Sequence, residues 1–289
     1  MQPAPSGVDF VNYFEGRAWV CSACGIRVDL WSLLLARVLD DHPLMPGVVS
    51  LGLGAFTVIT APLQPEETLF VDFAAHGIPS DATVVDVVMT PQTASEGLGL
   101  FPAVGVQHLQ TRGLPHALAL YPVTWPAPPA MATPAATTVN IMIIWMPAPT
   151  EPEQEPLFSA GKAFTTGDYR GAIVPAQIAV ELKLGQVLTE HFSQFAGKDV
   201  VRQFLNDGAT YGHQLRFLLP SLFGSVGAPP LPDKVAAALQ GLRKKRNRVG
   251  HEHHSTERAE AAPMLLAGLF GYRYVTAYGS LLTPTSTEM

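Results

Sequence analysis

The chain has 289 residues, of which 47% are hydrophobic and 15% are charged, and its formal net charge at pH 7 is -6. This composition excludes a disordered chain and a coiled coil, and the acidic balance excludes a protein that coats nucleic acid over its whole surface. Any contact with an anionic polymer must therefore be local. The length favours two units, each with its own core.

The start of the chain, "MQPAPSGVDF", has neither a basic region nor an apolar run. No uninterrupted apolar stretch reaches the roughly 20 residues that span a bilayer. Cys21 and Cys24 are the only cysteines, which excludes a disulfide framework. We therefore expect a cytoplasmic protein that does not enter the membrane.

Short β-branched runs alternate with Gly and Pro from about residue 15 to residue 147. An apolar segment at 29–41 interrupts this pattern and is helix-like. Runs of this kind, with turn residues between them, predict an antiparallel β-sandwich or barrel. The expected strands lie at 54–63, 68–77, 82–90, 116–125 and 138–146.

The segment 147–156 is rich in Pro and acidic residues, and it marks a domain boundary. Beyond it the apolar period lengthens toward 3.6, which predicts an all-α bundle. The fold class is therefore α+β, with a β-rich domain at 1–150 and a helical domain at 151–289. The expected helices lie at 157–165, at 169–192 after an Asp168 cap and with a kink at Pro175, at 198–219 with a break at "NDG" and an end at Pro220, at 233–249, and at 256–279 with Ser255 or Thr256 as N-cap.

A charged side chain falls within the expected apolar stripe of each of two helices. At about 100° per residue, Arg246 lies among the apolar positions of 233–249, and Glu181 among those of 169–192. A buried charge must be paired, or must line a cleft or an interface. The pattern suggests a buried or semi-buried Glu181–Arg246 pair, which either bridges the two helices or belongs to a site. The stripes consist of Val235, Leu239, Leu242 and Val249 around Arg246, and of Val174, Ile178, Leu182 and Leu188 around Glu181.

A basic run precedes a histidine cluster in "GLRKKRNRVGHEHH", residues 241–254. Lys244 and Arg248 point away from the apolar stripe and are explained simply by a solvated basic face. Gly250 is a plausible helix stop, which places His251 in a turn near the helix C-terminus. An imidazole in that position can titrate near neutrality.

The segment "LRKKRNRVGH" resembles the signature of the HEPN superfamily, through Arg246, the polar Asn247 and His251. The upstream "FTTGDYRGAIVPAQIAVE" is similar to the early helices of HEPN domains, so the resemblance covers about residues 155–283. It implies a metal-independent endoribonuclease that needs no cofactor for catalysis. It also implies a homodimer in which two signature helices face each other across a shared cleft.

The resemblance also implies catalytic roles for individual residues. His251 would act as general base on a ribose 2′-hydroxyl, or as acid toward the leaving 5′-oxygen. Arg246 would stabilise charge on the phosphoryl oxygens, and Asn247 would position that arrangement. Glu181 could orient Arg246 or His251. The products would carry 2′,3′-cyclic phosphate ends.

A local basic strip is sufficient for an acidic protein to hold a few phosphates of single-stranded RNA or tRNA. Arg243, Lys244, Lys245 and Arg248 are the residues expected to form it. By analogy, such a nuclease would be a toxin or phage-defence effector, with the β-rich domain as a sensor or restraint. The alternative is a non-catalytic HEPN-like dimerisation module that presents the β domain to a protein or a small ligand.

The segment "VCSACG" is similar to one knuckle of a zinc ribbon, with thiols of Cys21 and Cys24 at metal-binding spacing. A closed zinc site needs four ligands, so either two chains share the ion or histidines complete it. Structural thiols without a metal are the simpler interpretation. The cluster of His251, His253 and His254 is a weaker metal candidate, because the basic run beside it repels cations. The histidines that could complete the knuckle are His42, His76, His108 and His116.

Overall fold

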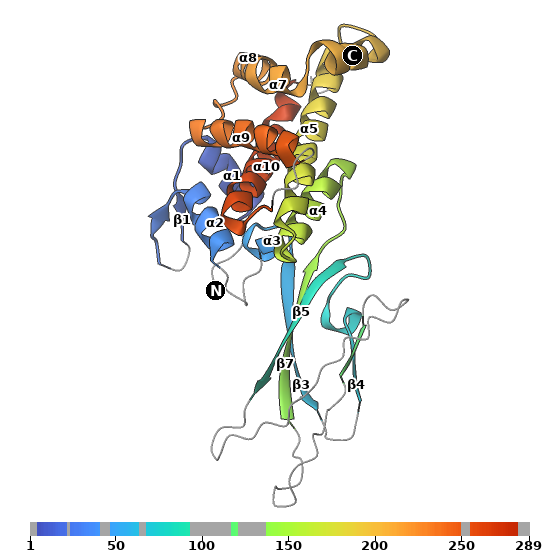
Figure 1. Ribbon diagram of the computed structural model, residues 1–289. Coiled ribbons are helices and arrows are strands. Elements are labelled where there is room, and N and C mark those ends of the chain that lie inside the picture. Colours follow the sequence, from blue (N-terminus) through green and yellow to red (C-terminus); the bar gives the residue numbers. More distant parts are fainter. Residues whose placement is uncertain are drawn as a thin grey trace, which may run out of the picture. The chain divides into compact units, whose positions relative to one another are not determined.

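The computed structural model describes residues 5–21, 24–40, 47–63, 68–92, 117–120, 137–249 and 255–282. The chain divides into two compact units. One unit combines Met1–Leu53 with Pro149–Met289 and contains the helices; the other is Gly54–Ala148 and contains the longer strands (Figure 1).

The β unit has two small antiparallel sheets. One has the strand order β3-β7-β5, and the other pairs β4 with β6. Each of the expected strands is present, although β4 is shorter than its run, and the run at 116–125 is described only over 117–120. The strands are β3 (Ala55–Leu63), β4 (Leu69–Asp72), β5 (Thr83–Gln92), β6 (Ala117–Leu120) and β7 (Thr137–Met146), with a 3₁₀ turn at Ala74–His76.

The two sheets contribute side chains to one hydrophobic cluster. In the central strand β7, Val139, Ile141 and Ile143 belong to it at alternating positions on one face, while Met142 and Ile144 on the opposite face are buried as well. On the other face, Thr60 donates a hydrogen bond to the Asn140 side chain across the β3–β7 pair, at 2.8 Å. The described strands form no closed barrel, and the sandwich stays a prediction.

The helical unit contains the expected C-terminal helices in their expected order. The side chain of Asp168 accepts a hydrogen bond from the Gly171 amide and caps α5 as predicted, and α5 continues through Pro175. The bounds are α1 (Gly7–Phe14), β1 (Trp19–Val20), β2 (Arg27–Val28), α2 (Leu30–Leu39), α3 (Gly47–Ser50), α4 (Glu155–Thr165), α5 (Tyr169–Phe192), α6 (Lys198–Gln203), α7 (Tyr211–His213), α8 (Leu219–Ser225), α9 (Asp233–Val249) and α10 (Arg258–Gly279).

Two local predictions in this unit were wrong, and a third was incomplete. Pro220 lies in the first turn of α8 and does not end a helix, which suits its missing amide hydrogen. Helix α10 begins later than expected, after Glu257 in the N-cap position rather than Ser255 or Thr256. The break expected near "NDG" is present, but the chain around it forms two π-helical segments, Phe204–Gly208 and Gln214–Leu218.

The N-terminal helices belong to the helical unit, whereas the sequence placed residues 1–53 with the β-rich domain. The reason is an aromatic cluster around Phe270 of α10. The rings of Phe10 and Tyr13 from α1, and of Trp31 from α2, each lie 5.0 Å from the Phe270 ring. Helix α1 itself was not predicted, although the Ser6–Asp9 capping box marks its start.

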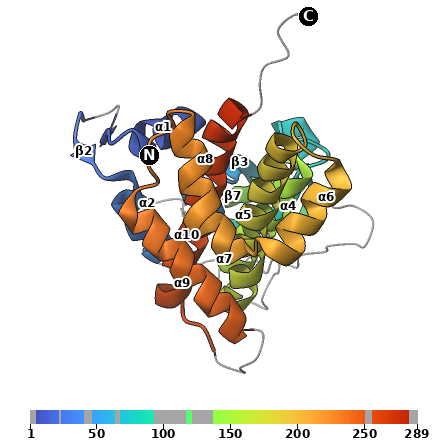
Figure 2. The same cartoon turned by 90° about the horizontal axis from the view of Figure 1, so that it is seen from above.

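Helices α5 and α10 approach closely because small residues line their contact. A Cβ atom added to Gly268 would lie 2.7 Å from the carbonyl oxygen of Ala176. Gly271 and Gly279 are similarly tight against Val180 and Val187 of α5. Helix α9 packs against α10 as well, and the two lie next to each other in Figures 1 and 2. These three helices form the centre of the unit.

The apolar stripe predicted for α5 is wrong. Of its four apolar positions only Leu188 is buried, and Leu182 is 47% exposed. The buried side of α5 combines alanines, Ala172, Ala176 and Ala179, with larger side chains such as Ile173 and Leu184. Helix α5 is apolar around most of its circumference, so its sequence does not single out one face.

The segment that enters the helical unit after β7 is anchored by a buried lysine. Nζ of Lys183, on α5, donates to a carboxylate oxygen of Glu151 at 2.7 Å, and the Tyr272 hydroxyl donates to the same oxygen at 3.3 Å. The Lys183 side chain is only 9% exposed. A buried ammonium group needs such a partner.

Helix α5 is also the one helix in the described part of the chain that is long and apolar enough to cross a membrane. More than half of it is buried against α4, α9 and α10. This is the position of a core helix in a soluble protein.

The α5–α10 contact predicts opposite effects for two glycine substitutions. Gly268→Ala should lower the free energy of unfolding by about 1–3 kcal/mol, because its methyl group must displace the Ala176 backbone. Gly185→Ala should raise it by up to about 1 kcal/mol, because alanine favours the helix and no described heavy atom lies within 4 Å of the added Cβ. Urea unfolding followed by circular dichroism measures both. Equal responses would contradict the close contact.

The Glu151–Lys183 pair predicts a pH-dependent contribution to stability. The hydrogen bond from Lys183 lowers the pKa of Glu151 below its ordinary value of 4.5. The stabilisation is therefore present above pH 4.5 and is lost as the pH falls through the lower pKa of the folded protein. Glu151→Gln should reduce the free energy of unfolding by about 1–2 kcal/mol at neutral pH.

The measurement is the unfolding midpoint as a function of pH for wild type and Glu151→Gln, which should converge in acid. Glu155→Gln, at an exposed position, is the control and should change little. Parallel curves for wild type and Glu151→Gln at all pH values would show that this pair contributes nothing.

Candidate functional site

Arg246 and Asn247 lie at the C-terminal end of α9, and both are exposed. Nη1 of Arg246 donates to Oδ1 of Asn247 at 3.4 Å, and among the described residues no carboxylate pairs with Arg246. Nη2 of Arg170 donates to the carbonyl oxygen of Val249 at 2.8 Å and so fixes the end of α9 to the start of α5. His251, His253 and His254 lie outside the described residues, so the approach of His251 to Arg246 stays a prediction.

Arg246 is not embedded in the apolar stripe of α9, as the sequence analysis had it. Val235, Leu239 and Leu242 are buried, but the buried stripe stops at Leu242. Arg246 comes one turn later, where the helix leaves the packed core. An exposed guanidinium is available to bind an anion.

Glu181 lies on α5 and is half-buried. It accepts a hydrogen bond from Nε2 of Gln177 at 3.4 Å, and no ion pair joins it to Arg246. The predicted Glu181–Arg246 pair is therefore absent from the structure. The two side chains instead line the same groove.

The predicted basic strip divides into free and engaged residues. Lys244 and Arg248 are exposed. Lys245 forms an ion pair with Glu260 of α10, at 2.9 Å. Arg243 is half-buried, with its guanidinium packed so closely on Gly212 that an added Cβ there would lie 3.0 Å from Nη1. Two of the four residues are thus free to contact phosphate.

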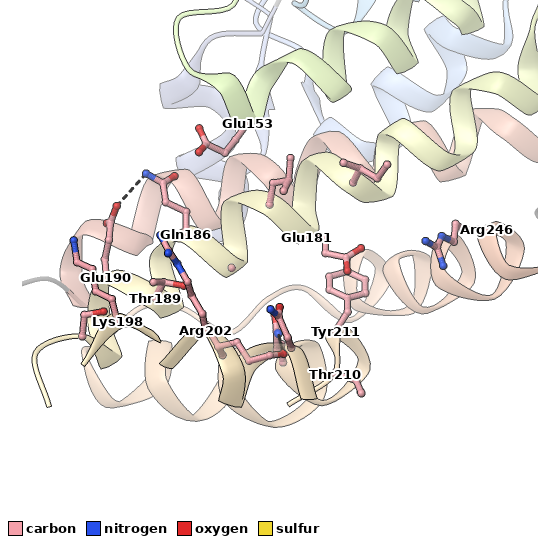
Figure 3. Close-up of a pocket in the computed structure, with 17 residues that line it drawn as sticks. Glu153, Glu181, Gln186, Thr189, Glu190, Lys198, Arg202, Thr210, Tyr211 and Arg246 are labelled. Atoms are coloured by element: carbon pink, nitrogen blue, oxygen red, sulfur yellow. Dashed lines mark hydrogen bonds between the residues drawn. The ribbon is translucent and has the colours of Figure 1, made fainter. Parts of the chain in front are cut away.

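The groove shared by Glu181 and Arg246 has a volume of about 930 Å³. One wall is α5, and the opposite wall is the segment from α6 to the second π-helical segment. In Figure 3, Arg246 lies at one end and Lys198 with Glu190 at the other, with Glu181 and Tyr211 between them. Its charged side chains are three acids and three bases: Glu153, Glu181, Glu190, Lys198, Arg202 and Arg246.

Tyr211 is a deeply buried tyrosine that lines this groove. It is 9% exposed, and its hydroxyl has no hydrogen-bond partner among the described residues. Burial, and then the charge of Glu181, raise the pKa of Tyr211 well above its ordinary value, so the hydroxyl stays protonated. A buried hydroxyl without a partner costs about 1–3 kcal/mol. An unpaired donor facing a groove is therefore a candidate contact for a ligand.

The sequence analysis missed Tyr211, Lys198 and Arg202. Lys198 and Arg202 lie in α6 and Tyr211 lies in α7, on either side of the first π-helical segment. π-Helical segments are uncommon and often occur at functional sites. Apolar spacing does not predict where π-helical segments occur, so no sequence signal identified these three residues.

Cys21 and Cys24 lie in the turn between β1 and β2. The Gly25 amide donates to the Cys21 carbonyl oxygen at 2.8 Å, and Gly25 has a φ of 70°. Cys21 is buried and Cys24 exposed, and neither is joined in a disulfide. The described residues contain no group of three or more His, Cys, Asp or Glu side chains that could hold a metal. Of the histidines that could complete the knuckle, His76 is exposed in the β unit, whereas His42, His108 and His116 lie outside the described residues.

Comparison with known proteins finds no counterpart for this chain. No protein-family model matches it, and no match was found among curated proteins or solved structures. The resemblance to HEPN domains therefore stays a prediction from the sequence, based on Arg246, Asn247 and His251 and on the segment upstream of them.

The structure predicts different roles for two neighbouring arginines. Arg243→Ala should lower the free energy of unfolding by about 1–2 kcal/mol, because its stem and guanidinium pack between α9 and α7. Arg246→Ala should change it by less than about 0.5 kcal/mol, as expected for an exposed side chain. Thermal melting of the two variants provides the measurement. Equal destabilisation would show that Arg246 has a structural role after all.

Proposed function

We propose that the helical unit is a metal-independent endoribonuclease of the HEPN type that works as a homodimer. The observation that supports this most is the exposed Arg246, next to Asn247 and free of any described carboxylate partner at the end of α9. The exposed Lys244 and Arg248 lie in the same part of the helix. An unneutralised guanidinium presents a fixed fork of donors that suits phosphate oxygens.

In the proposed reaction the 2′-oxygen of ribose attacks the adjacent phosphorus. His251 removes the proton from the 2′-hydroxyl, and Arg246 stabilises the charge that develops on the phosphoryl oxygens. The bond from phosphorus to the 5′-oxygen breaks, and that oxygen receives a proton from a second acid, which a histidine can also supply. The products are a 2′,3′-cyclic phosphate and a 5′-hydroxyl, so DNA is not cleaved.

The substrate is single-stranded RNA or tRNA, held locally by Lys244 and Arg248. A protein with a net charge of -6 repels RNA over most of its surface, so binding depends on these few contacts. The β unit is the candidate site for a protein or small-ligand regulator. A role as a toxin or phage-defence effector follows from the proposed activity by analogy.

A second candidate function is a non-catalytic binding module. It is favoured by large apolar side chains exposed on the segment from the end of α5 to the second π-helical segment. Phe195 is 75% exposed and Phe217 is 61% exposed, and Val200 and Phe204 are also exposed. Exposed apolar side chains in such number are typical of surfaces that bind another protein.

The nuclease proposal predicts cleavage of single-stranded RNA and tRNA by the full chain in EDTA, with cyclic phosphate ends on the products. Arg246→Ala and His251→Ala should each reduce the rate by about 100-fold or more, because each removes a group that acts in the transition state. Lys162→Ala, an exposed basic residue on α4, is the control and should cleave like wild type.

The ends of the products are mapped by enzymatic phosphorylation and by mass spectrometry. A folded dimer that leaves all tested RNAs intact would favour the binding module. Expression in cells adds a second readout, since a nuclease should be toxic and the His251→Ala variant should be tolerated.

A further inference from the structure

The groove of Figure 3 extends beyond the residues that the proposed cleavage uses. From Arg246 on α9 it follows α5 past Ile178, Leu182 and Gly185 toward Lys198. Leu182 is an apolar side chain that no other helix covers, and Leu205 faces the groove from the opposite wall. These apolar side chains lie between Arg246 at one end of the groove and the cations Lys198 and Arg202 toward the other.

The Tyr211 hydroxyl is a donor that requires an acceptor. The Tyr211 side chain is nine-tenths buried and lines the groove, and its hydroxyl is unpaired among the described residues. Glu181 and Arg243 are the charged groups that act on it. Buried polar groups in folded proteins are nearly always hydrogen-bonded, so an acceptor on a bound ligand would complete this one.

Lys198 and Arg202 supply a second cationic position at the far end of the groove. No described carboxylate pairs with Lys198, and the contact of Arg202 with Asp199 is long, at 3.9 Å, with the arginine side chain 66% exposed. A surface pair of this kind is weak. A phosphate can therefore replace solvent at Lys198 and replace Asp199 at Arg202.

The acids of the groove determine what kind of polyanion it accepts. Three acids balance three bases, so net charge does not draw a polyanion in. Phosphates must meet Lys198, Arg202 and Arg246 individually, while Glu181 and Glu190 can accept hydrogen bonds from ribose hydroxyls or base amino groups. The apolar positions suit exposed base faces, which only an unpaired strand offers.

We propose that the single-stranded RNA next to the cleaved bond lies along this groove, with one phosphate at Arg246, another at Lys198 and Arg202, and the Tyr211 hydroxyl donating a hydrogen bond to it. This inference rests on the proposed endoribonuclease function. It names the class of substrate and three contacts outside the basic strip. Tyr211 is a contact residue for the strand and takes no part in the proton transfers.

The test measures binding of a labelled single-stranded RNA oligonucleotide by fluorescence anisotropy, in the His251→Ala background to prevent cleavage. Adding Tyr211→Phe should weaken binding about three- to tenfold, the effect of one lost hydrogen bond, and should leave the melting temperature unchanged or raised. Tyr278→Phe is the matched control, because its hydroxyl is also buried and unpaired among the described residues but does not line the groove.

A second measurement uses the salt dependence of binding. For the Lys198→Ala/Arg202→Ala double variant, the slope of log affinity against log salt concentration should become shallower by about 0.7, the value for one phosphate contact on a single strand. Lys162→Ala should shift that slope by less than the double variant does. A fully base-paired RNA of the same sequence should bind more weakly than the single strand.

The outcomes separate this inference from the proposed function. If wild type neither binds nor cleaves RNA, the nuclease proposal is wrong and the inference falls with it. If wild type cleaves RNA but Tyr211→Phe and the double variant bind like the parent, only the inference is overturned. Equal weakening by Tyr278→Phe would also overturn it, because the effect would then reflect general loosening of the helices.

Discussion

The close approach of α5 and α10 is the constraint on which the rest of the helical unit depends. Gly268 allows the α10 backbone to reach the Ala176 carbonyl, and Gly271 and Gly279 extend the contact along α5. Packing α10 on this face of α5 brings α9 alongside and fixes where Arg246 emerges. The face of α5 that carries Leu182 and Glu181 forms one wall of the groove instead. The groove is the consequence of that uneven packing.

The two faces of α5 show how stability and function are divided. The packed face meets the glycines of α10 in tight contact, and the groove face carries Glu181 and Glu190 and lies opposite Tyr211 of α7, whose hydroxyl is unpaired among the described residues. Local departures from full pairing are expected where a protein binds a ligand. They reduce stability when no ligand is bound, and a well-packed opposite face offsets that loss.

The sequence predicted most of the C-terminal helices and the strands because apolar spacing and turn residues carry that information. The bounds of α9 agree with prediction, and β3 and β7 differ by one residue. Spacing did not predict the buried face of α5, because alanines contribute little to an apolar pattern yet decide the closest contact. Nor did it reveal that Phe10 and Trp31 pack on Phe270, since partners so distant in sequence leave no local trace. For the site, the sequence singled out Arg246 and Glu181, which line the same groove without forming the expected pair, but it did not single out Tyr211.

The β unit is inserted within the sequence of the helical unit, between Leu53 and Pro149. Helices α1 and α2 are therefore synthesised before the β unit, while Phe270, the ring around which their aromatic side chains gather, is synthesised after it. The β unit can fold as soon as it emerges, but the apolar faces of α1 and α2 must wait for α10. Contacts between such distant segments form slowly. A chain that stops before α10 would leave these aromatic residues uncovered, so early termination should yield an aggregating fragment rather than an active one.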